Sequence, residues 1–180
     1  MYISFKRKEE IRCLADELLL ASIGPVVRDK FPLDLGACAK GAGLTVKLGE
    51  FENIFAAYCR NDKLIFVQGN TIQAVYRYKA FAAAHFLGHF LMHKEKFSEI
   101  FRFEEFISKP NGGMLLAKPK QIDRKEKEME READYFAAHL VIPEGILRQA
   151  RRRTEWSLFD LSVIFGAPYE ATGFRFKEKI

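Results

Sequence analysis

The first part of the chain places apolar residues with a helical period. These apolar positions are Ile11, Leu14, Ala15, Leu18 and Leu19. Their spacing of three to four residues predicts an amphipathic helix over residues 8–22, with one face that must pack against another element. Pro32 and Asp34 predict the start of a second, short helix that runs through Ala39, and the glycines at 41 and 43 permit the left-handed turn that ends it.

Three later segments have the composition of β-strands. Residues 44–48, 54–58 and 63–67 are rich in β-branched and aromatic side chains. Asn61 and Asp62 stand between the second and third segments, where a hairpin turn would lie. The pattern therefore predicts a small antiparallel sheet.

The remaining pattern is mainly helical. Long helices are expected over residues 72–93 and 124–140, and the connection between them, residues 94–123, is expected to be irregular with one short helix or strand. Short helices are predicted near residues 144–152, 156–165 and 168–177. The chain therefore belongs to the α+β class, with residues 1–143 as the main domain and residues 144–180 as a C-terminal helical segment packed on it.

Composition narrows the class of protein. The chain has 180 residues, of which 48% are hydrophobic and 29% charged, so a disordered or disulfide-stapled chain is excluded. Its three cysteines, Cys13, Cys38 and Cys59, lack C-x-x-C spacing, which excludes a cysteine zinc site and indicates a reducing cytoplasm. No apolar stretch is long enough to span a bilayer, and no secretory signal is visible, so no membrane is expected.

Two histidines interrupt the most apolar helix. The segment AFAAAHFLGHFLM contains His85 and His89 as its only polar side chains, and a separation of four residues places both on one helix face. One interpretation is two ordinary core histidines. The other is a metal site, since unpartnered buried imidazoles each cost about 1–3 kcal/mol and a shared metal ion satisfies both. Gly88 lies between them and indicates close approach of another element.

A third ligand is expected from the helix at 124–140. Glu130 and Asp134 share a face there, so Glu130 can bind the metal while Asp134 accepts a hydrogen bond from a ligand imidazole. Glu132 is an alternative ligand. The competing interpretation is a solvated charge run, because residues 124–131 alternate in sign as exposed helices do.

Taken together, the segments HFLGHFLMH and EREADYFAAHLVIP resemble the ImmA/IrrE family of intracellular metallopeptidases, whose motifs read H-E-L-G-H and E-x-E-A-N-x-F-A-A followed by Pro. The resemblance implies a zincin-like metallopeptidase domain with zinc held by His85, His89 and Glu130. It places Asp134 where the family usually has Asn. It also implies a helix-turn-helix repressor as partner or substrate.

The catalytic position departs from that family. Phe86 stands where an H-E-x-x-H metallopeptidase has the glutamate that takes a proton from the metal-bound water. Phenylalanine cannot titrate, and loss of a general acid–base group costs about 10²–10⁴ in rate. The sequence therefore predicts a pseudo-peptidase that keeps the His/His/Glu framework and acts by binding a partner. An active zinc endopeptidase that uses an unusual base, or Lewis-acid activation alone, stays open as an alternative.

The C-terminal segment offers a third hypothesis. Residues 161–168, followed by Thr172 and Arg175, resemble the turn and second helix of a helix-turn-helix motif. The net charge of +5 also permits an acidic partner. A DNA-binding regulator would use Arg152 and Arg175, whereas a structural helix pair or a partner-docking surface would not require them.

Overall fold

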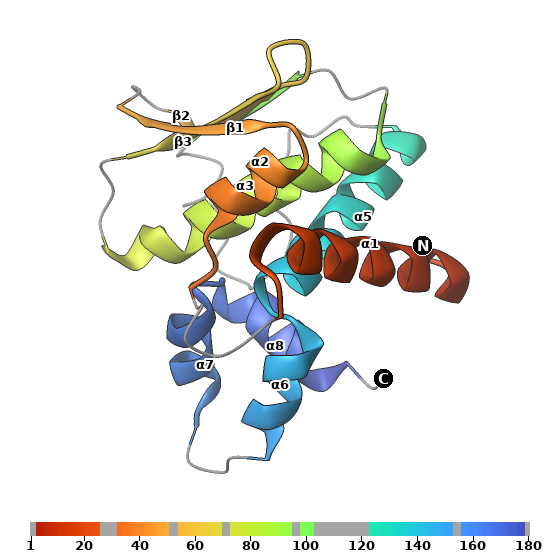
Figure 1. Ribbon diagram of the computed structural model, residues 1–180, viewed down its shortest axis with the longest axis vertical. Coiled ribbons are helices and arrows are strands. Elements are labelled where there is room, and N and C mark those ends of the chain that lie inside the picture. Colours follow the sequence, from red (N-terminus) through yellow and green to blue (C-terminus); the bar gives the residue numbers. More distant parts are fainter. Residues whose placement is uncertain are drawn as a thin grey trace.

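A computed structural model describes residues 3–25, 32–50, 54–69, 73–94, 98–102, 123–152 and 156–178. Within these residues, seven helices and four strands follow one another as α1 (Phe5–Ile23), α2 (Leu35–Gly41), β1 (Thr45–Gly49), β2 (Ile54–Cys59), β3 (Leu64–Gln68), α3 (Gln73–Met92), β4 (Ser98–Arg102), α5 (Arg124–Val141), α6 (Glu144–Arg151), α7 (Leu158–Phe165) and α8 (Tyr169–Lys177). The sheet lies at one end of the molecule and α6–α8 at the other, with α1, α3 and α5 between them (Figure 1). The predicted α+β class is confirmed.

The sheet is mixed, which corrects the prediction of an antiparallel one. Its strand order is β1-β3-β2-β4, in which β2 pairs antiparallel with both β3 and β4, but β1 pairs parallel with β3. The reason is that β3 returns from the hairpin turn at Asn61 and Asp62 and inserts between β1 and β2. β1 and β2 do run in opposite directions, but they are not neighbours. β4 is the one short strand expected in the irregular connection, and residues 103–122 of that connection lie outside the described residues.

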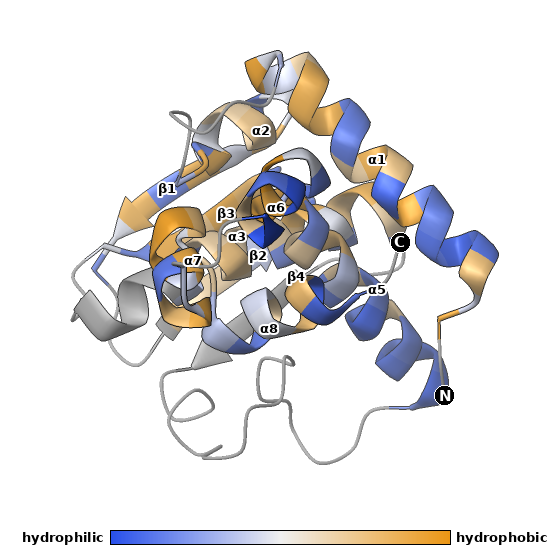
Figure 2. Cartoon of the chain, turned by 90° about the horizontal axis from the view of Figure 1, so that it is seen from below, coloured by the Kyte–Doolittle hydropathy of each residue, from blue (hydrophilic) through white to orange (hydrophobic). Residues whose placement is uncertain are grey.

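The long helices start and end close to where the pattern predicts. Ser4 caps α1 by accepting a hydrogen bond from the backbone N–H of Arg7, and Asp123 caps α5 by accepting one from Glu126. α1 buries Ile11, Ala15, Leu18 and Leu19, which are four of its five predicted apolar positions. Figure 2 shows hydrophilic and hydrophobic residues alternating along α1, whereas the first turns of α5 are hydrophilic.

The core lies between the sheet and the central helices. α3 packs on β2 and β3 on one side and on α5 on the other, and α1 packs against α5. Gly88 on α3 makes the close approach to α5 possible: a Cβ atom there would lie 3.3 Å from the Cα atom of Ala133. Among the described residues, no helix is long and apolar enough to cross a membrane. The fold thus brings the histidine helix into direct contact with the helix that carries the acidic motif.

Candidate metal centre

α3 presents two imidazoles to the same buried space. His85 and His89 are one helical turn apart, both are fully buried, and their Nε2 atoms lie 3.0 Å from each other. The surrounding residues of α3, including Phe81, Ala82 and Phe86, are buried apolar side chains. The two rings therefore meet in an interior that offers few polar groups, as the sequence pattern indicated.

Glu130 completes a triangle of ligand atoms. Its Oε2 atom lies 3.2 Å from His85 Nε2 and 3.3 Å from His89 Nε2, and its side chain is 1% exposed. His85, His89 and Glu130 are the one group of three or more His, Cys, Asp or Glu residues in the described part of the chain whose ligand atoms converge in this way. The structure thus brings together the three residues that the sequence selects as ligands.

The spacing of these three atoms fits a metal ion. Zinc bonds nitrogen and oxygen ligands at about 2.0–2.2 Å, so ligands at tetrahedral angles are about 3.3–3.6 Å apart. The three separations, 3.0, 3.2 and 3.3 Å, lie at or slightly below that range. Two imidazole nitrogens and a carboxylate oxygen are also ligand types that zinc accepts in catalytic sites, where one position stays open. The residues therefore fit zinc in both chemistry and spacing.

Asp134 orients His85. Its Oδ1 atom lies 2.7 Å from His85 Nδ1, and both side chains are buried. An ionised carboxylate only accepts hydrogen bonds, so Nδ1 of His85 carries the proton and donates it to this bond. The lone pair of His85 then lies on Nε2, the atom that faces Glu130 and His89. A histidine ligand is usually held in this way by a carboxylate behind it.

Glu132 points away from the triangle. Its Oε2 atom accepts a hydrogen bond from Arg7 on α1 at 2.6 Å and lies 3.1 Å from His93 Nε2. Burial opposes ionisation of this carboxyl, but the hydrogen bonds with His93 and Arg7 outweigh it and lower the pKa of Glu132 to about 2. The structure therefore favours Glu130 over Glu132 as the third ligand.

His93 is a residue whose contacts the sequence did not reveal. It follows the last residue of α3, is 4% exposed, and places Nδ1 at 2.9 Å from Nδ1 of His89. Arg60 holds this end of the helix, because its Nη2 atom donates to the carbonyl oxygens of His89, Phe90 and His93. The repeat of histidines every four residues signalled that His93 shares a face with His85 and His89. No pattern in the sequence signalled Arg7, which lies 125 positions from Glu132.

Phe86, which the resemblance places at the general-base position, is a core residue. Its ring is fully buried, stacks on Tyr58 of β2 at a centroid distance of 5.8 Å and meets the His85 ring edge-on at 5.7 Å. Tyr58 carries a hydroxyl group that can titrate, but burial raises the pKa of Tyr58 to about 12 against the opposing charge of Arg60. Its hydroxyl therefore stays protonated at neutral pH and supplies no base.

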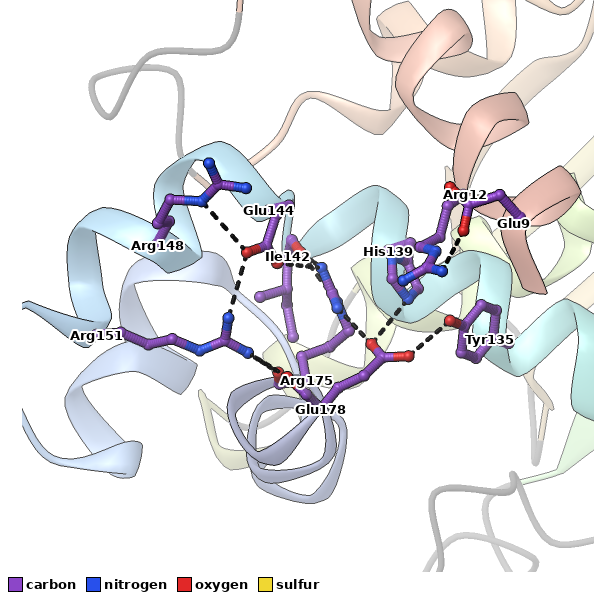
Figure 3. A network of polar contacts seen from close by, with 10 residues as sticks. All are labelled: Glu9, Arg12, Tyr135, His139, Ile142, Glu144, Arg148, Arg151, Arg175 and Glu178. Carbon is purple, nitrogen blue, oxygen red and sulfur yellow. Dashed lines mark hydrogen bonds and ion pairs between the residues drawn. The ribbon is translucent and has the colours of Figure 1, made fainter. Parts of the chain in front are cut away.

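Of the two arginines predicted to contact nucleic acid, Arg175 lies inside the domain. Arg175 is fully buried, donates to the Ile142 carbonyl oxygen at 3.2 and 3.3 Å, and pairs with Glu178 and Glu144 (Figure 3). Thr172 is also buried, and its hydroxyl donates to the Pro168 carbonyl oxygen. The prediction that Arg175 contacts nucleic acid is therefore wrong: its charge is used inside the domain to join α8 to α5 and α6. Arg152, at the end of α6, is exposed.

Comparison with known proteins assigns a family to this arrangement. The family of peptidases described as the IrrE N-terminal-like domain matches residues 70–177, which include α3, α5 and the C-terminal helices. The match therefore contains every residue of the His/His/Glu triangle. No curated protein matches the chain.

Proposed function

The chain belongs to the peptidase family of IrrE N-terminal-like domains, and from that membership we propose that it binds zinc at His85, His89 and Glu130 but is catalytically impaired and acts by binding a regulatory protein. The observation that carries the proposal is the buried triangle of ligand atoms, 3.0–3.3 Å apart, beside a phenylalanine at the general-base position. Zinc held there would supply Lewis acidity and an open coordination position.

The impairment follows from how the neighbouring carboxylates are used. A metallopeptidase needs a base that removes a proton from the attacking water and returns it to the leaving amine. Phe86 has no such group. Glu130 is in the ligand triangle, Asp134 is hydrogen-bonded to His85, and Glu132 is paired with Arg7 and His93. Each of these carboxylates already has a structural partner, so none of them replaces the glutamate.

The partner that fits the resemblance is a helix-turn-helix repressor. A domain that has kept the His/His/Glu framework but lost its base would hold such a protein without cutting it. DNA binding by the domain itself is less favoured, because Arg175, one of the two residues expected to contact DNA, is buried. An active zinc endopeptidase remains the competing function because the His/His/Glu triangle is intact.

Metal content tests the first half of the proposal. We expect about one zinc per chain by elemental analysis of the purified protein, and loss of that zinc in His89→Ala. Glu128→Ala, at a partly exposed position on the N-terminal half of α5, is the matched control and is expected to keep the metal, because Glu128 is outside the triangle. A wild-type protein without stoichiometric zinc, or a His89→Ala variant that keeps it, contradicts the proposal.

Restoring a base tests the second half. We expect no cleavage of a helix-turn-helix repressor by the wild-type protein and chelator-sensitive cleavage by Phe86→Glu. Phe86→Gln is the matched control, because it introduces similar polarity into the same buried position without a titratable group. Each variant is first checked for cooperative unfolding, since Phe86 is fully buried. Cleavage by the wild-type protein that His89→Ala abolishes would establish the active endopeptidase instead.

A further inference from the structure

A line of hydrogen bonds runs from the metal centre to the first helix. His89 Nδ1 lies 2.9 Å from His93 Nδ1, His93 Nε2 lies 3.1 Å from Glu132 Oε2, and the same oxygen accepts from Arg7 Nη2 at 2.6 Å. These residues come from three elements, because His89 is on α3, Glu132 on α5 and Arg7 on α1. His89 is fully buried and His93 nearly so, and the guanidinium at the far end is partly exposed. We call these four residues the His93 relay.

In the neutral form of His93, the charged end of the relay determines the direction of each hydrogen bond. Glu132 faces the permanent cation Arg7, so its carboxylate only accepts hydrogen bonds. His93 must therefore donate from Nε2. A neutral imidazole that donates from one nitrogen accepts at the other, so His93 Nδ1 accepts from the Nδ1–H group of His89. The lone pair of His89 is then left on Nε2, which faces the triangle.

We propose that His93 is a positioning residue that holds His89 in the tautomer able to bind metal, and that Glu132 and Arg7 fix His93 in turn. This inference rests on the proposed zinc binding. His85 has a carboxylate, Asp134, behind its Nδ1 atom, whereas His89 has a second histidine there. The two ligand histidines thus present their Nε2 atoms to Glu130 by different means.

The geometry also shows what the relay prevents. If Nδ1 of His93 donated instead, Nδ1 of His89 would accept, and the proton of a neutral His89 would lie on Nε2. That proton would point at His85 Nε2, 3.0 Å away, and would block a metal ion from the nitrogen. Loss of such an orienting partner typically weakens metal binding about 10–100-fold. Arg60 supports the arrangement by binding the carbonyl oxygens of both His89 and His93.

Two substitutions at His93 separate positioning from packing. His93→Asn places an amide oxygen near the position of Nδ1 and still accepts from His89, whereas His93→Leu fills similar space without an acceptor. Competition with a chromophoric chelator is expected to give a zinc Kd about 10–100-fold weaker for His93→Leu and within about threefold of wild type for His93→Asn. Urea unfolding of the metal-free proteins reports any loss of stability separately. Equal zinc affinity in His93→Leu and wild type, or equal losses in both variants, would overturn the inference.

The tautomer of His89 can be measured directly in the metal-free protein. Long-range ¹H–¹⁵N correlation spectra of the metal-free wild type are expected to show His89 protonated on Nδ1, and His93→Leu is expected to lose this preference. His89 protonated on Nε2 in the wild type would refute the positioning role. A wild-type protein that binds no zinc would contradict the proposed function, but the spectra would still decide the inference on His93.

Discussion

Gly88 of α3 lies against the ring of Phe136 on α5 so closely that a Cβ atom on the glycine would be 3.0 Å from Phe136 Cδ1. The glycine lies one residue before His89, and Phe136 lies two residues after Asp134 on the facing helix. The distance between the two helices therefore decides whether Glu130 reaches the two histidines. Any residue larger than glycine must displace a fully buried ring or the α5 backbone.

Gly88→Ala is expected to weaken both the fold and the metal site. Overpacking costs about 1–3 kcal/mol, against a gain of about 1 kcal/mol in helix propensity, so the free energy of unfolding falls by about 1 kcal/mol. The zinc Kd rises as α5 moves away. Gly145→Ala is the matched control, since no atom lies within 4 Å of the added methyl group, and its free energy of unfolding should not fall. Urea titrations and chelator competition measure both effects, and a Gly88→Ala protein as stable as wild type contradicts the close-packing argument.

Asp134 offers a prediction on the orientation of His85. Asp134→Leu removes the acceptor 2.7 Å from His85 Nδ1 and is expected to weaken zinc binding about 10–100-fold. Asp134→Asn keeps an amide oxygen in the same place and is expected to stay within about threefold of wild type. Chelator competition distinguishes the two. If both variants lose zinc to the same extent, hydrogen bonding to His85 is not the property that matters.

Local patterns predicted the residues of the His/His/Glu triangle because each motif lies within one helix. The spacing of His85 and His89, and that of Glu130 and Asp134, places each pair on one face without any knowledge of tertiary structure. Gly88 also indicated that the two helices approach each other, and the structure confirms that approach. The remaining step, that the two faces meet, came from the resemblance to a family.

Contacts between distant segments could not be predicted. The parallel pairing of β1 with β3 depends on which strand inserts between β1 and β2, and strand composition does not determine that. The Arg7–Glu132 pair joins α1 to α5, two helices that are far apart in the sequence. Arg175 has the character of a surface residue in sequence, because charged side chains are rarely buried without partners. Its partners, Glu178, Glu144 and the Ile142 carbonyl oxygen, are visible only in the folded structure.

Arg175 is expected to behave as a structural residue. Arg175→Met removes a fully buried cation, together with its hydrogen bonds to the Ile142 carbonyl oxygen. Glu178 keeps its hydrogen bond from Tyr135 and Glu144 keeps its ion pair with Arg151, so we expect a loss of about 1–3 kcal/mol in the free energy of unfolding. Arg152→Met, at an exposed position, should change stability by no more than about 0.5 kcal/mol. Urea unfolding compares the two variants. The nucleic-acid hypothesis would instead be supported if the wild type bound duplex DNA in a salt-sensitive way and a folded Arg175→Met variant did not.

The polar contacts around Arg175 and Glu178 also predict how the free energy of unfolding depends on pH. His139 on α5 lies with Nε2 at 3.1 Å from Glu178 Oε2 and with its ring 4.4 Å from that of Tyr135 (Figure 3). Burial lowers the pKa of His139 to about 4 and outweighs the carboxylate, and the charges of Arg175 and Arg12 add to the lowering. Burial opposes ionisation of Glu178, but its contact with His139 and its hydrogen bond from Tyr135 outweigh burial and lower the pKa of Glu178 to about 2.

Both shifts predict a loss of stability in acid. In the unfolded chain the His139 imidazole titrates near about 6.5 and the Glu178 carboxyl near about 4.3. Between pH 6.5 and 4 the unfolded state therefore binds more protons at His139 than the folded state does, so the free energy of unfolding falls as the pH is lowered through that window. Glu178 extends the loss from about pH 4.5 towards 2. His139→Gln cannot titrate and removes the first component. Urea titrations at pH 7.5, 6, 5 and 4 measure the free energy of unfolding of both proteins. We expect that of the wild type to fall more steeply than that of His139→Gln as the pH is lowered. If the two free energies fall in parallel, the His139 imidazole does not have the lowered pKa that its burial predicts.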